Sequence, residues 1–443
     1  MILETIVMVI DYVLFASCIF ILLGSIYISF QTRFVQLRFL PKLLRMLLFS
    51  QKTKEGLHTI SPHRALFTAM STTIGIGTIV GPVIAIHLGG PGALLGFLLT
   101  AFFGSAATYT EVNLCILHRK KLESGKVLGG PMQYLQALIS PFAAKWYAIC
   151  GSILMAAWSA AQANQLAAIL NSPLLGDYRI ATGYSGIFLS LLVLSILLGG
   201  IKRISSFSSK LVPVMFILYL GSIAWILFSN MDQWGDVFAE IWNSAFTPYA
   251  MASGTLVGGI VSSMRWGVFK GMQVTEAGVG TQTIPHSMAE TDDAESQGIL
   301  AMLSTYSAGI LSFLSGFVAL ITKTWQDPDL PLGISMVAAS FQQYFTYFGI
   351  FIIVISSFLF AFGTILGNSY NGAQCFGYFT QNRKEVYYYF FSALVIFLGT
   401  ISGVTFVWSI IDIGLAFLVL PHMAALLLHV SKKKETLLKP VAD

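Results

Sequence analysis

The chain has 443 residues, of which 56% are hydrophobic and only 10% are charged, and its formal net charge is +5. A soluble protein with this composition would aggregate in water, so the composition excludes a soluble globular protein and predicts a polytopic membrane protein. The apolar runs lack the strict alternation of a transmembrane β-barrel, and we therefore expect an all-α fold.

Apolar runs long enough to cross about 30 Å of hydrocarbon recur along the whole chain. No basic residue precedes the first run, which we interpret as a retained helix rather than a cleaved signal peptide. The expected organisation is a single transmembrane domain over residues 1–443. We place eleven transmembrane helices at approximately residues 7–29, 63–88, 92–118, 145–170, 183–200, 210–229, 253–289, 296–322, 345–376, 386–401 and 404–430.

The basic residues gather in every second loop. With the N-terminus outside, all these loops are cytoplasmic and the opposite side keeps only Arg179 and Lys323, as the positive-inside rule requires. We therefore expect a cell-membrane protein with its N-terminus outside and its C-terminus in the cytoplasm. The basic loop residues are Arg33, Arg38, Lys42, Arg45, Lys52, Lys54, Arg119, Lys120, Lys121, Lys126, Lys202, Arg203, Arg383, Lys384, Lys432, Lys433, Lys434 and Lys439.

The second apolar run contains an unusual stretch, STTIGIGTIVGP, at residues 71–82. Each glycine costs a helix about 1 kcal/mol relative to alanine, and Pro82 also removes a backbone donor. One interpretation is that Gly75, Gly77 and Gly81 allow close helix packing. The other is that the helix is broken here, so that free backbone groups can bind a ligand.

A second glycine-rich interruption favours the broken-helix interpretation. Without the first helix and its basic loop (1–62), the remaining ten spans divide into two halves of five, 63–229 and 253–430, followed by a tail at 431–443. The first span of one half contains IGIGT and the first span of the other contains AGVGT. Interruptions at corresponding places predict a five-plus-five inverted-repeat transporter that binds its substrate at the two breaks.

Ionisable and amide side chains also lie within the predicted spans, where each costs a few kcal/mol unless it faces a cavity or a partner. Glu276 adjoins the second break and could bind a cation or a substrate ammonium, or cap free backbone groups; we favour the capping role. Glu111 is expected to pair with a basic loop or another helix, and Arg265 and Lys270 with internal acids. The full set is Glu111, Gln162, Asn164, Arg265, Lys270, Thr275, Glu276, Thr364, Asn368, Asn371 and Asp412.

Ala361 and Thr364 are three residues apart in the stretch AFGTILGNSYNG, so both could face the first break. A hydroxyl oxygen together with several carbonyls suits a hard cation such as Na⁺. The alternative is a Thr364 hydroxyl bonded to its own helix. The sequence has no nucleophile elbow, phosphate loop or HExxH motif, so we expect neither an enzyme nor a nucleic-acid partner.

Several longer blocks follow one another between about residues 14 and 430. They include ALFTAMSTTIGIGTIVGPVIAIHLGGPGALLG, YTEVNLCILHRKK with GGPMQYL, QANQLA, WGVFKGMQVTEAGVGTQTIPHSMAETDDAESQG and FAFGTILGNSYNG. In this order they resemble the alanine or glycine:cation symporter family, sodium-coupled carriers with a leucine-transporter-like fold. The number of ordered blocks makes the resemblance specific.

The resemblance implies symport of a small neutral amino acid, alanine or glycine in L or D form, inward with Na⁺ by alternating access. It implies no cofactor besides the coupling ion, and a carrier that works as a monomer in the lipid bilayer. The expected substrate-binding residues are Gly77, Thr78, Ile79, Gly81, Gln162, Thr275, Glu276, Gly278 and Asn368, and the expected cation-binding residues are Gly75, Thr78, Ala361 and Thr364.

The sequence departs from the family pattern around the expected site. Replacing the family's tryptophan by Asn368 removes a large apolar wall and adds two donors and an acceptor. A larger or more polar amino acid than alanine is therefore an alternative substrate, and proton coupling or a non-transporting sensor or channel are alternative functions. The departures are Thr78 for Asn, Val274 and Thr275 for Ser-Asn, Thr281 and Gln282 for Ser-Ala, Asn368 for Trp and His422 for Asn.

Overall fold

The computed structural model describes residues 2–48, 55–56, 58–123, 125–246, 256–381 and 384–432. The all-helical architecture predicted from the composition is confirmed, apart from a hairpin of β1 (Lys120–Lys121) and β2 (Val127–Leu128). Three short 3₁₀ helices are η1 (Pro173–Tyr178), η2 (Met231–Gln233) and η4 (Thr324–Gln326). The α-helices are α1 (Ile2–Gln31), α2 (Val35–Arg38), α3 (Leu40–Leu48), α4 (Pro62–Thr73), α5 (Ile76–Gly89), α6 (Ala93–His118), α7 (Pro131–Leu138), α8 (Pro141–Leu170), α9 (Thr182–Leu197), α10 (Gly200–Phe228), α11 (Trp234–Phe246), α12 (Leu256–Thr275), α13 (Thr283–Ser287), α14 (Ala294–Thr322), α15 (Ile334–Phe345), α16 (Tyr347–Phe379), α17 (Glu385–Ile401) and α18 (Val404–Lys432).

Helix starts carry residues suited to them. Pro62, Pro131 and Pro141 stand in the first turns of α4, α7 and α8, where a missing N–H costs nothing. The Asp293 side chain accepts from the Ser296 N–H at 3.0 Å and caps α14. α4 begins within one residue and α14 within two residues of the predicted starts, whereas α8 begins four residues before its predicted start and α7 was not predicted.

Within the described residues, seven helices are long and apolar enough to cross a membrane, and three shorter apolar helices accompany them. The predicted span 253–289 is interrupted in the structure, and its first residues, 253–255, lie outside the described part of the chain. Of the predicted tail, 431–443, the structure describes only residues 431 and 432. The count of eleven crossings therefore stays a prediction.

The start of α10 differs most from its predicted position. The prediction began this span at residue 210, whereas the helix begins at Gly200, whose φ of +67° makes the turn from α9. Lys202 and Arg203 were interpreted as loop residues because of their charge. They form the first turn of α10 instead, since long basic side chains can reach a polar region from the end of a helix.

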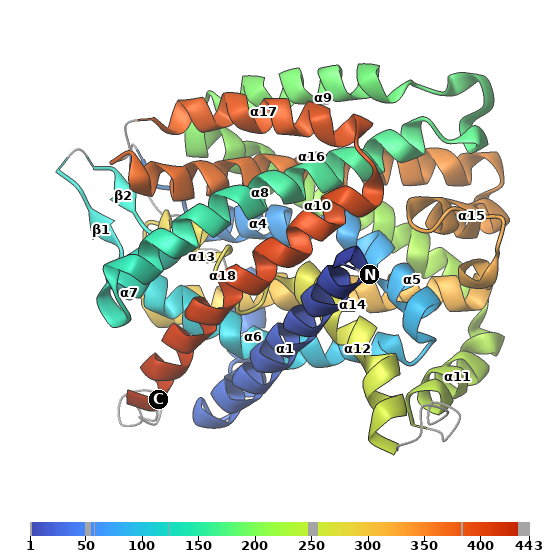
Figure 1. The fold of residues 1–443 in the computed structure, drawn as a ribbon, viewed down its shortest axis with the longest axis horizontal. Coiled ribbons are helices and arrows are strands. Elements are labelled where there is room, and N and C mark those ends of the chain that lie inside the picture. The colour runs from blue at the N-terminus through green and yellow to red at the C-terminus, as the bar shows by residue number, and fades with distance from the viewer. Residues whose placement is uncertain are drawn as a thin grey trace.

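Corresponding helices of the two predicted halves pack against each other. α6 packs along α14, α8 along α16 and α9 along α17, and Figure 1 shows α9 and α17 side by side at one edge of the bundle. The broken helices are paired in the same way, with α5 on α12 and α4 on α13. This pairing agrees with two related halves, and the inverted symmetry itself stays a prediction.

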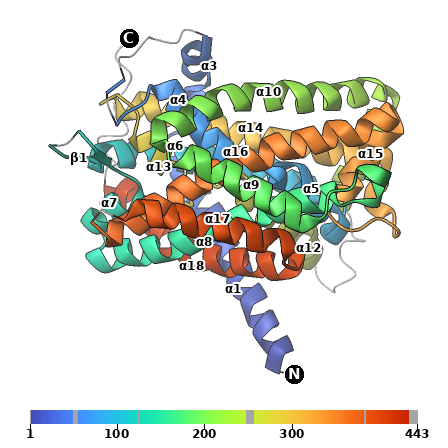
Figure 2. The same ribbon diagram turned by 90° about the horizontal axis from the view of Figure 1, so that it is seen from above.

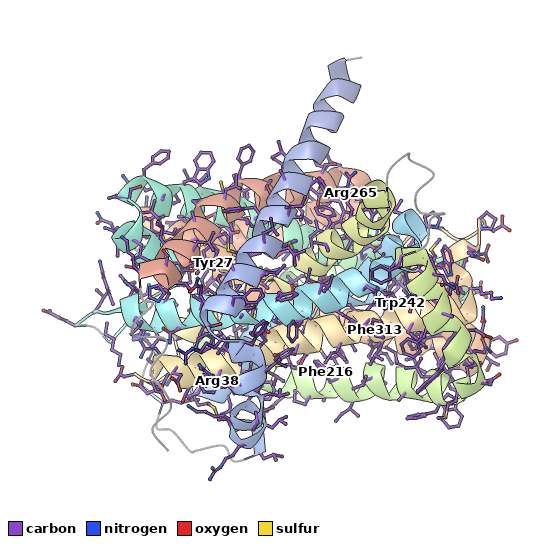
Figure 3. The ribbon with its side chains drawn as sticks, turned by 90° about the horizontal axis from the view of Figure 1, so that it is seen from below. Tyr27, Arg38, Phe216, Trp242, Arg265 and Phe313 are labelled. Carbon is purple, nitrogen blue, oxygen red and sulfur yellow. The ribbon has the colours of Figure 1, made fainter. Side chains whose placement is uncertain are left out.

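α1 lies at the periphery, beside α18, and Figure 2 shows its N-terminal end extending beyond the other helices. Large apolar side chains cover the outside of the bundle, among them Ile217 on α10 and Leu191 on α9. Figure 3 shows side chains projecting from the outer helices around the bundle. An apolar surface this extensive fits contact with lipid rather than water.

α6 and α12 approach so closely that two glycines face each other with no room for side chains. A Cβ added at Gly267 would lie 2.7 Å from the carbonyl carbon of Ala93, and one added at Gly96 would lie 2.7 Å from the Gly267 Cα. Backbone atoms cannot give way cheaply, so these glycines set the distance between α6 and α12.

We predict that Gly267→Ala lowers the thermal unfolding temperature of the purified protein in detergent, because overpacking of this kind costs about 1–3 kcal/mol. The matched control is Gly221→Ala in α10, where nothing lies within 4 Å of the added Cβ. That substitution should leave the unfolding temperature unchanged or raise it. Equal behaviour of the two variants would show that the α6–α12 contact is not tight.

Candidate functional site

The first predicted break is present between α4 and α5. α4 ends at Thr73, α5 begins at Ile76, and Gly75 between them is extended (φ −108°, ψ −169°). The Ile76 N–H donates to Oε1 of Gln162 on α8 at 2.8 Å, so a side chain satisfies a backbone group freed by the break. A Cβ at Gly75 would lie 2.6 Å from the Thr364 hydroxyl oxygen and 2.8 Å from Gln162 Oε1, which explains the glycine.

The second predicted break is also present, between Thr275 at the end of α12 and Thr283 at the start of α13. Gly278 and Gly280 have φ values of +74° and +92°, which glycine adopts at little cost. Glu276 has a φ of +50°, uncommon for a residue with a side chain. The strained conformation turns the chain sharply where the helix ends.

A buried polar cluster from three helices holds the second break. The Gly280 N–H donates to Glu111 Oε2 on α6 at 3.1 Å, and His422 Nε2 on α18 lies 3.9 Å from the same oxygen. His422 Nδ1 lies 2.7 Å from the Gly278 carbonyl oxygen, which can only accept, so Nδ1 carries the proton. Nε2 of the neutral ring then accepts from the Tyr134 hydroxyl on α7, 2.5 Å away.

The roles of the two buried glutamates therefore differ from our expectations. Glu111, expected to pair with a basic loop or another helix, caps the second break through the Gly280 amide. Glu276, for which we favoured capping, accepts a hydrogen bond from the Thr281 hydroxyl instead. Its side chain lines a pocket, which is the binding alternative left open by the sequence.

A small pocket lies between the two breaks, with a cavity volume of about 30 Å³. It brings together seven of the predicted site residues from α5, α8, α16 and the two interrupted regions. They are Gly75, Gly77, Gly81, Gln162, Glu276, Thr364 and Asn368. Seven predicted site residues that lie far apart along the chain therefore line one pocket, and their binding roles stay predictions.

The other predicted site residues are not among those that line this pocket. Thr78 donates to the Gly75 carbonyl, and the Ile79 carbonyl accepts from Ser315 at 3.0 Å. The Gly278 carbonyl faces His422. The remaining two, Thr275 and Ala361, are fully buried.

The pocket also has lining residues that our site prediction missed. Lys270 Nζ donates to Gln273 Oε1 at 3.0 Å, and Gln273 Nε2 donates to Asp412 Oδ1 at 2.5 Å. Lys270 therefore meets an acid, Asp412, only indirectly, through the Gln273 side chain that bonds to both. Lys270 Nζ also lies 4.6 Å from the ring centre of Trp408, another lining residue. The sequence shows Lys270 and Asp412 as charged residues inside predicted spans, where burial in the membrane is costly. No sequence pattern linked them to the pocket.

Arg265, also expected to pair with an internal acid, lies at the edge of the bundle near α1 (Figure 3). Its guanidinium carbon is 5.2 Å from the ring centre of Phe15 and 5.6 Å from that of Trp266. The aromatic faces stabilise the cation at this position. Arg265 is not among the residues that line the pocket.

Thr364 joins the pocket to the first break. Its hydroxyl donates across to the Ser71 carbonyl of α4 at 3.0 Å, so it is engaged with a neighbouring helix. Its oxygen also lies close to Gly75. The oxygens that lie next to Gly75 are the Thr364 hydroxyl and the Gln162 carboxamide oxygen. Such neutral oxygens are ligands for a hard monovalent cation.

The far ends of the two broken helices are fastened together beyond the pocket. The Glu290 N–H donates to the Ile60 carbonyl at 2.8 Å, which joins the segment before α4 to the segment after α13. Arg119 at the end of α6 donates to the carbonyls of Ser287 and Ala289, at 2.9 and 2.6 Å. A guanidinium suits this place, since carbonyls at a helix C-terminus carry partial negative charge. We call the region around Arg119, where α6 ends beside α13, the basic end of the bundle.

Comparisons with known proteins identify a transporter family. A family model described as the sodium:alanine symporter family matches residues 1–439. An uncharacterized transporter of Haemophilus influenzae is 32% identical over 432 residues, which cover 96% of this chain and 94% of the relative. The sodium/alanine symporter AgcS of Methanococcus maripaludis is 30% identical over 418 residues, covering 92% and 90%. The probable sodium/glutamine symporter GlnT of Bacillus subtilis is 28% identical over 447 residues, covering 99% and 90%.

The fold is also similar to that of a solved transporter. The crystal structure of a mutant manganese transporter of Eremococcus coleocola superimposes with a TM-score of 0.50 at 12% identity. The match covers 85% of this chain and 79% of that one. At this identity the likeness concerns the arrangement of helices and says nothing of the substrate.

We predict that Glu111→Leu destabilises the protein, because it leaves the buried Gly280 N–H without its acceptor. An unsatisfied buried donor costs about 1–3 kcal/mol. Glu111→Gln keeps an acceptor oxygen of the same reach and serves as the matched control. Thermal unfolding in detergent should rank the glutamine variant clearly above the leucine variant. If both lose the same stability, the bond to Gly280 does not hold the break.

Proposed function

This chain belongs to the sodium:alanine symporter family, and from this premise we propose that it is a secondary active carrier that imports a small neutral amino acid with Na⁺ by alternating access. The observation that carries the proposal is the position of the pocket, which lies between two interrupted helices. Breaks inside a membrane leave backbone groups available, and ligand contacts recover the lost helix energy.

The charges in the pocket suit a zwitterion. Lys270 and Glu276 both line it, one positive and one negative. A free amino acid carries one charge of each sign, so its carboxylate can approach Lys270 and its ammonium Glu276. Pairing recovers part of the cost of burying these charges. Gly75, Gly77 and Gly81 carry no side chains on one wall of the pocket, which suits a small substrate, alanine or glycine in L or D form.

For the coupling ion we propose a place beside the first break. The Thr364 hydroxyl and the Ser71 carbonyl offer neutral oxygens there. A proton-coupled carrier is the second candidate, favoured by the Glu276 carboxylate in the pocket. A carboxylate there could take up and release a proton during the cycle.

The proposed setting is a cell membrane, with the N-terminus outside, the C-terminus in the cytoplasm and the basic end facing the cytoplasm. In this orientation the contacts of Arg119 close the cytoplasmic side of the site. The carrier is proposed to work as a monomer.

Uptake of labelled alanine into proteoliposomes tests the function. We expect accumulation when a Na⁺ gradient is imposed and its loss when an ionophore collapses that gradient. A pH gradient without Na⁺ serves as the matched control and should drive uptake only if protons are coupled. Alanine uptake that ignores the Na⁺ gradient would contradict sodium symport. A fixed ratio of charge to alanine would separate a carrier from a sensor or channel.

We predict that Thr364→Ala raises the Na⁺ concentration for half-maximal uptake by about tenfold, which corresponds to about 1.4 kcal/mol. The physical reason is the loss of one oxygen from the proposed cation site. Thr364→Ser keeps the hydroxyl and should retain a Na⁺ requirement near that of the natural protein. An unchanged requirement in the alanine variant would place the cation elsewhere.

A further inference from the structure

Asn368 on α16 is the one lining residue of the pocket whose side-chain polar atoms are all buried without a hydrogen-bond partner in the described structure. It is 1% exposed, and neither Oδ1 nor Nδ2 has a bond. Buried polar groups are nearly always paired, because a group that leaves water without gaining a new partner loses the hydrogen bonds that water provided. An unpaired, buried carboxamide among the residues that line a pocket therefore points to a ligand that completes it.

We propose that Asn368 forms a side-chain subsite and that this carrier prefers an amino acid whose side chain ends in a carboxamide. The inference rests on the proposed function and narrows its substrate class. A carboxamide offers one acceptor and two donors, so two of them can join through a pair of N–H···O bonds. Asparagine or glutamine would thus satisfy Oδ1 and Nδ2 of Asn368 together.

Other ligand chemistries leave part of Asn368 unpaired. A cation beside Thr364 could use the Oδ1 of Asn368, but Nδ2 would still lack an acceptor. A substrate carboxylate only accepts and leaves Oδ1 without a donor, and an ammonium only donates and leaves Nδ2 open. An apolar side chain leaves both atoms open. The carboxamide of a substrate side chain satisfies both atoms with one planar group and leaves Lys270 and Glu276 for the carboxylate and ammonium.

The position of Asn368 also suits the side chain of a bound amino acid. The charged lining residues, Lys270 and Glu276, come from α12 and the break that follows it, whereas Asn368 comes from α16. The charges would hold the carboxylate and ammonium of the substrate, and its side chain would extend toward α16. Asn368 lies four residues after Thr364, about one helical turn, and so shares its face of α16.

The first experiment compares amino acids of equal shape as inhibitors of labelled alanine uptake by the natural protein in proteoliposomes. Asparagine, leucine and aspartate differ chiefly in whether the side chain ends in a carboxamide, two methyl groups or a carboxylate. We expect asparagine or glutamine to inhibit at a concentration at least tenfold lower than leucine or aspartate. A site built to form hydrogen bonds rejects analogues that lack them.

The second experiment measures the same inhibition ratio in Asn368→Leu, which keeps the size of the side chain and removes its hydrogen-bonding atoms. The ratio of carboxamide to leucine inhibition should fall to near one, whatever the overall rate of the variant. Gln374→Leu is the matched control, because Gln374 lies on the same helix and lines a separate pocket. The control should keep the ratio of the natural protein.

A direct binding measurement keeps the test decisive if the variant does not transport. Asparagine or glutamine should raise the unfolding temperature of the purified natural protein more than leucine at the same concentration. Sodium-driven alanine uptake with equal inhibition by asparagine, glutamine and leucine would overturn this inference and leave the proposed function standing. Failure of every amino acid, alanine included, to shift unfolding or enter the vesicles would overturn both.

Discussion

The structure depends on the satisfaction of backbone hydrogen bonds at two helix breaks inside an apolar bundle. No water is available there to bond the freed groups, so side chains of other helices must do so. Gln162 on α8 bonds the Ile76 amide at the first break, and Glu111 on α6 bonds the Gly280 amide at the second. Both side chains reach across from helices far away in the sequence. The breaks therefore depend on α8 and α6 being packed beside them. The pocket in turn depends on the breaks, because it lies between them.

The residues that line the pocket differ in chemistry from one wall to the next. One wall consists of glycines of the first break, whose missing side chains leave space for a ligand. The α12 side offers charge through Lys270, whose ammonium is bonded to Gln273. The α16 side offers neutral oxygens and an amide, from Thr364 and Asn368. Charge and neutral polarity are thus kept on opposite helices. A zwitterionic ligand and a cation can bind close together in such a site without competing for the same groups.

Much of the fold follows from local properties of the sequence. Hydrophobic length placed the span predicted at 92–118 within a residue of α6, and the helix-weakening glycines located both breaks. The start of α10 was misplaced because a charged helical turn has the composition of a loop. The partner of Glu111 was beyond reach, since the carboxylate meets Gly280 across 169 residues and its helix allows several orientations. Distant polar contacts depend on how helices rotate against each other, which hydropathy does not encode.

The contacts at the basic end constrain how the site can open. The hydrogen bond between the Glu290 N–H and the Ile60 carbonyl joins the segments that flank α4 and α13. These two helices, one piece of each broken helix, therefore form one unit. Arg119 links that unit to the end of α6. Opening the pocket toward this end must either break the Arg119 bonds or carry α6 along with the unit. The first route exchanges a few carbonyl contacts of the buried Arg119 side chain for other contacts, whereas the second must shear the glycine contact between α6 and α12. Hydrogen bonds can be exchanged one at a time, whereas the close-packed glycine contact has no room to deform, so the Arg119 contacts are the cheaper place for the carrier to change state.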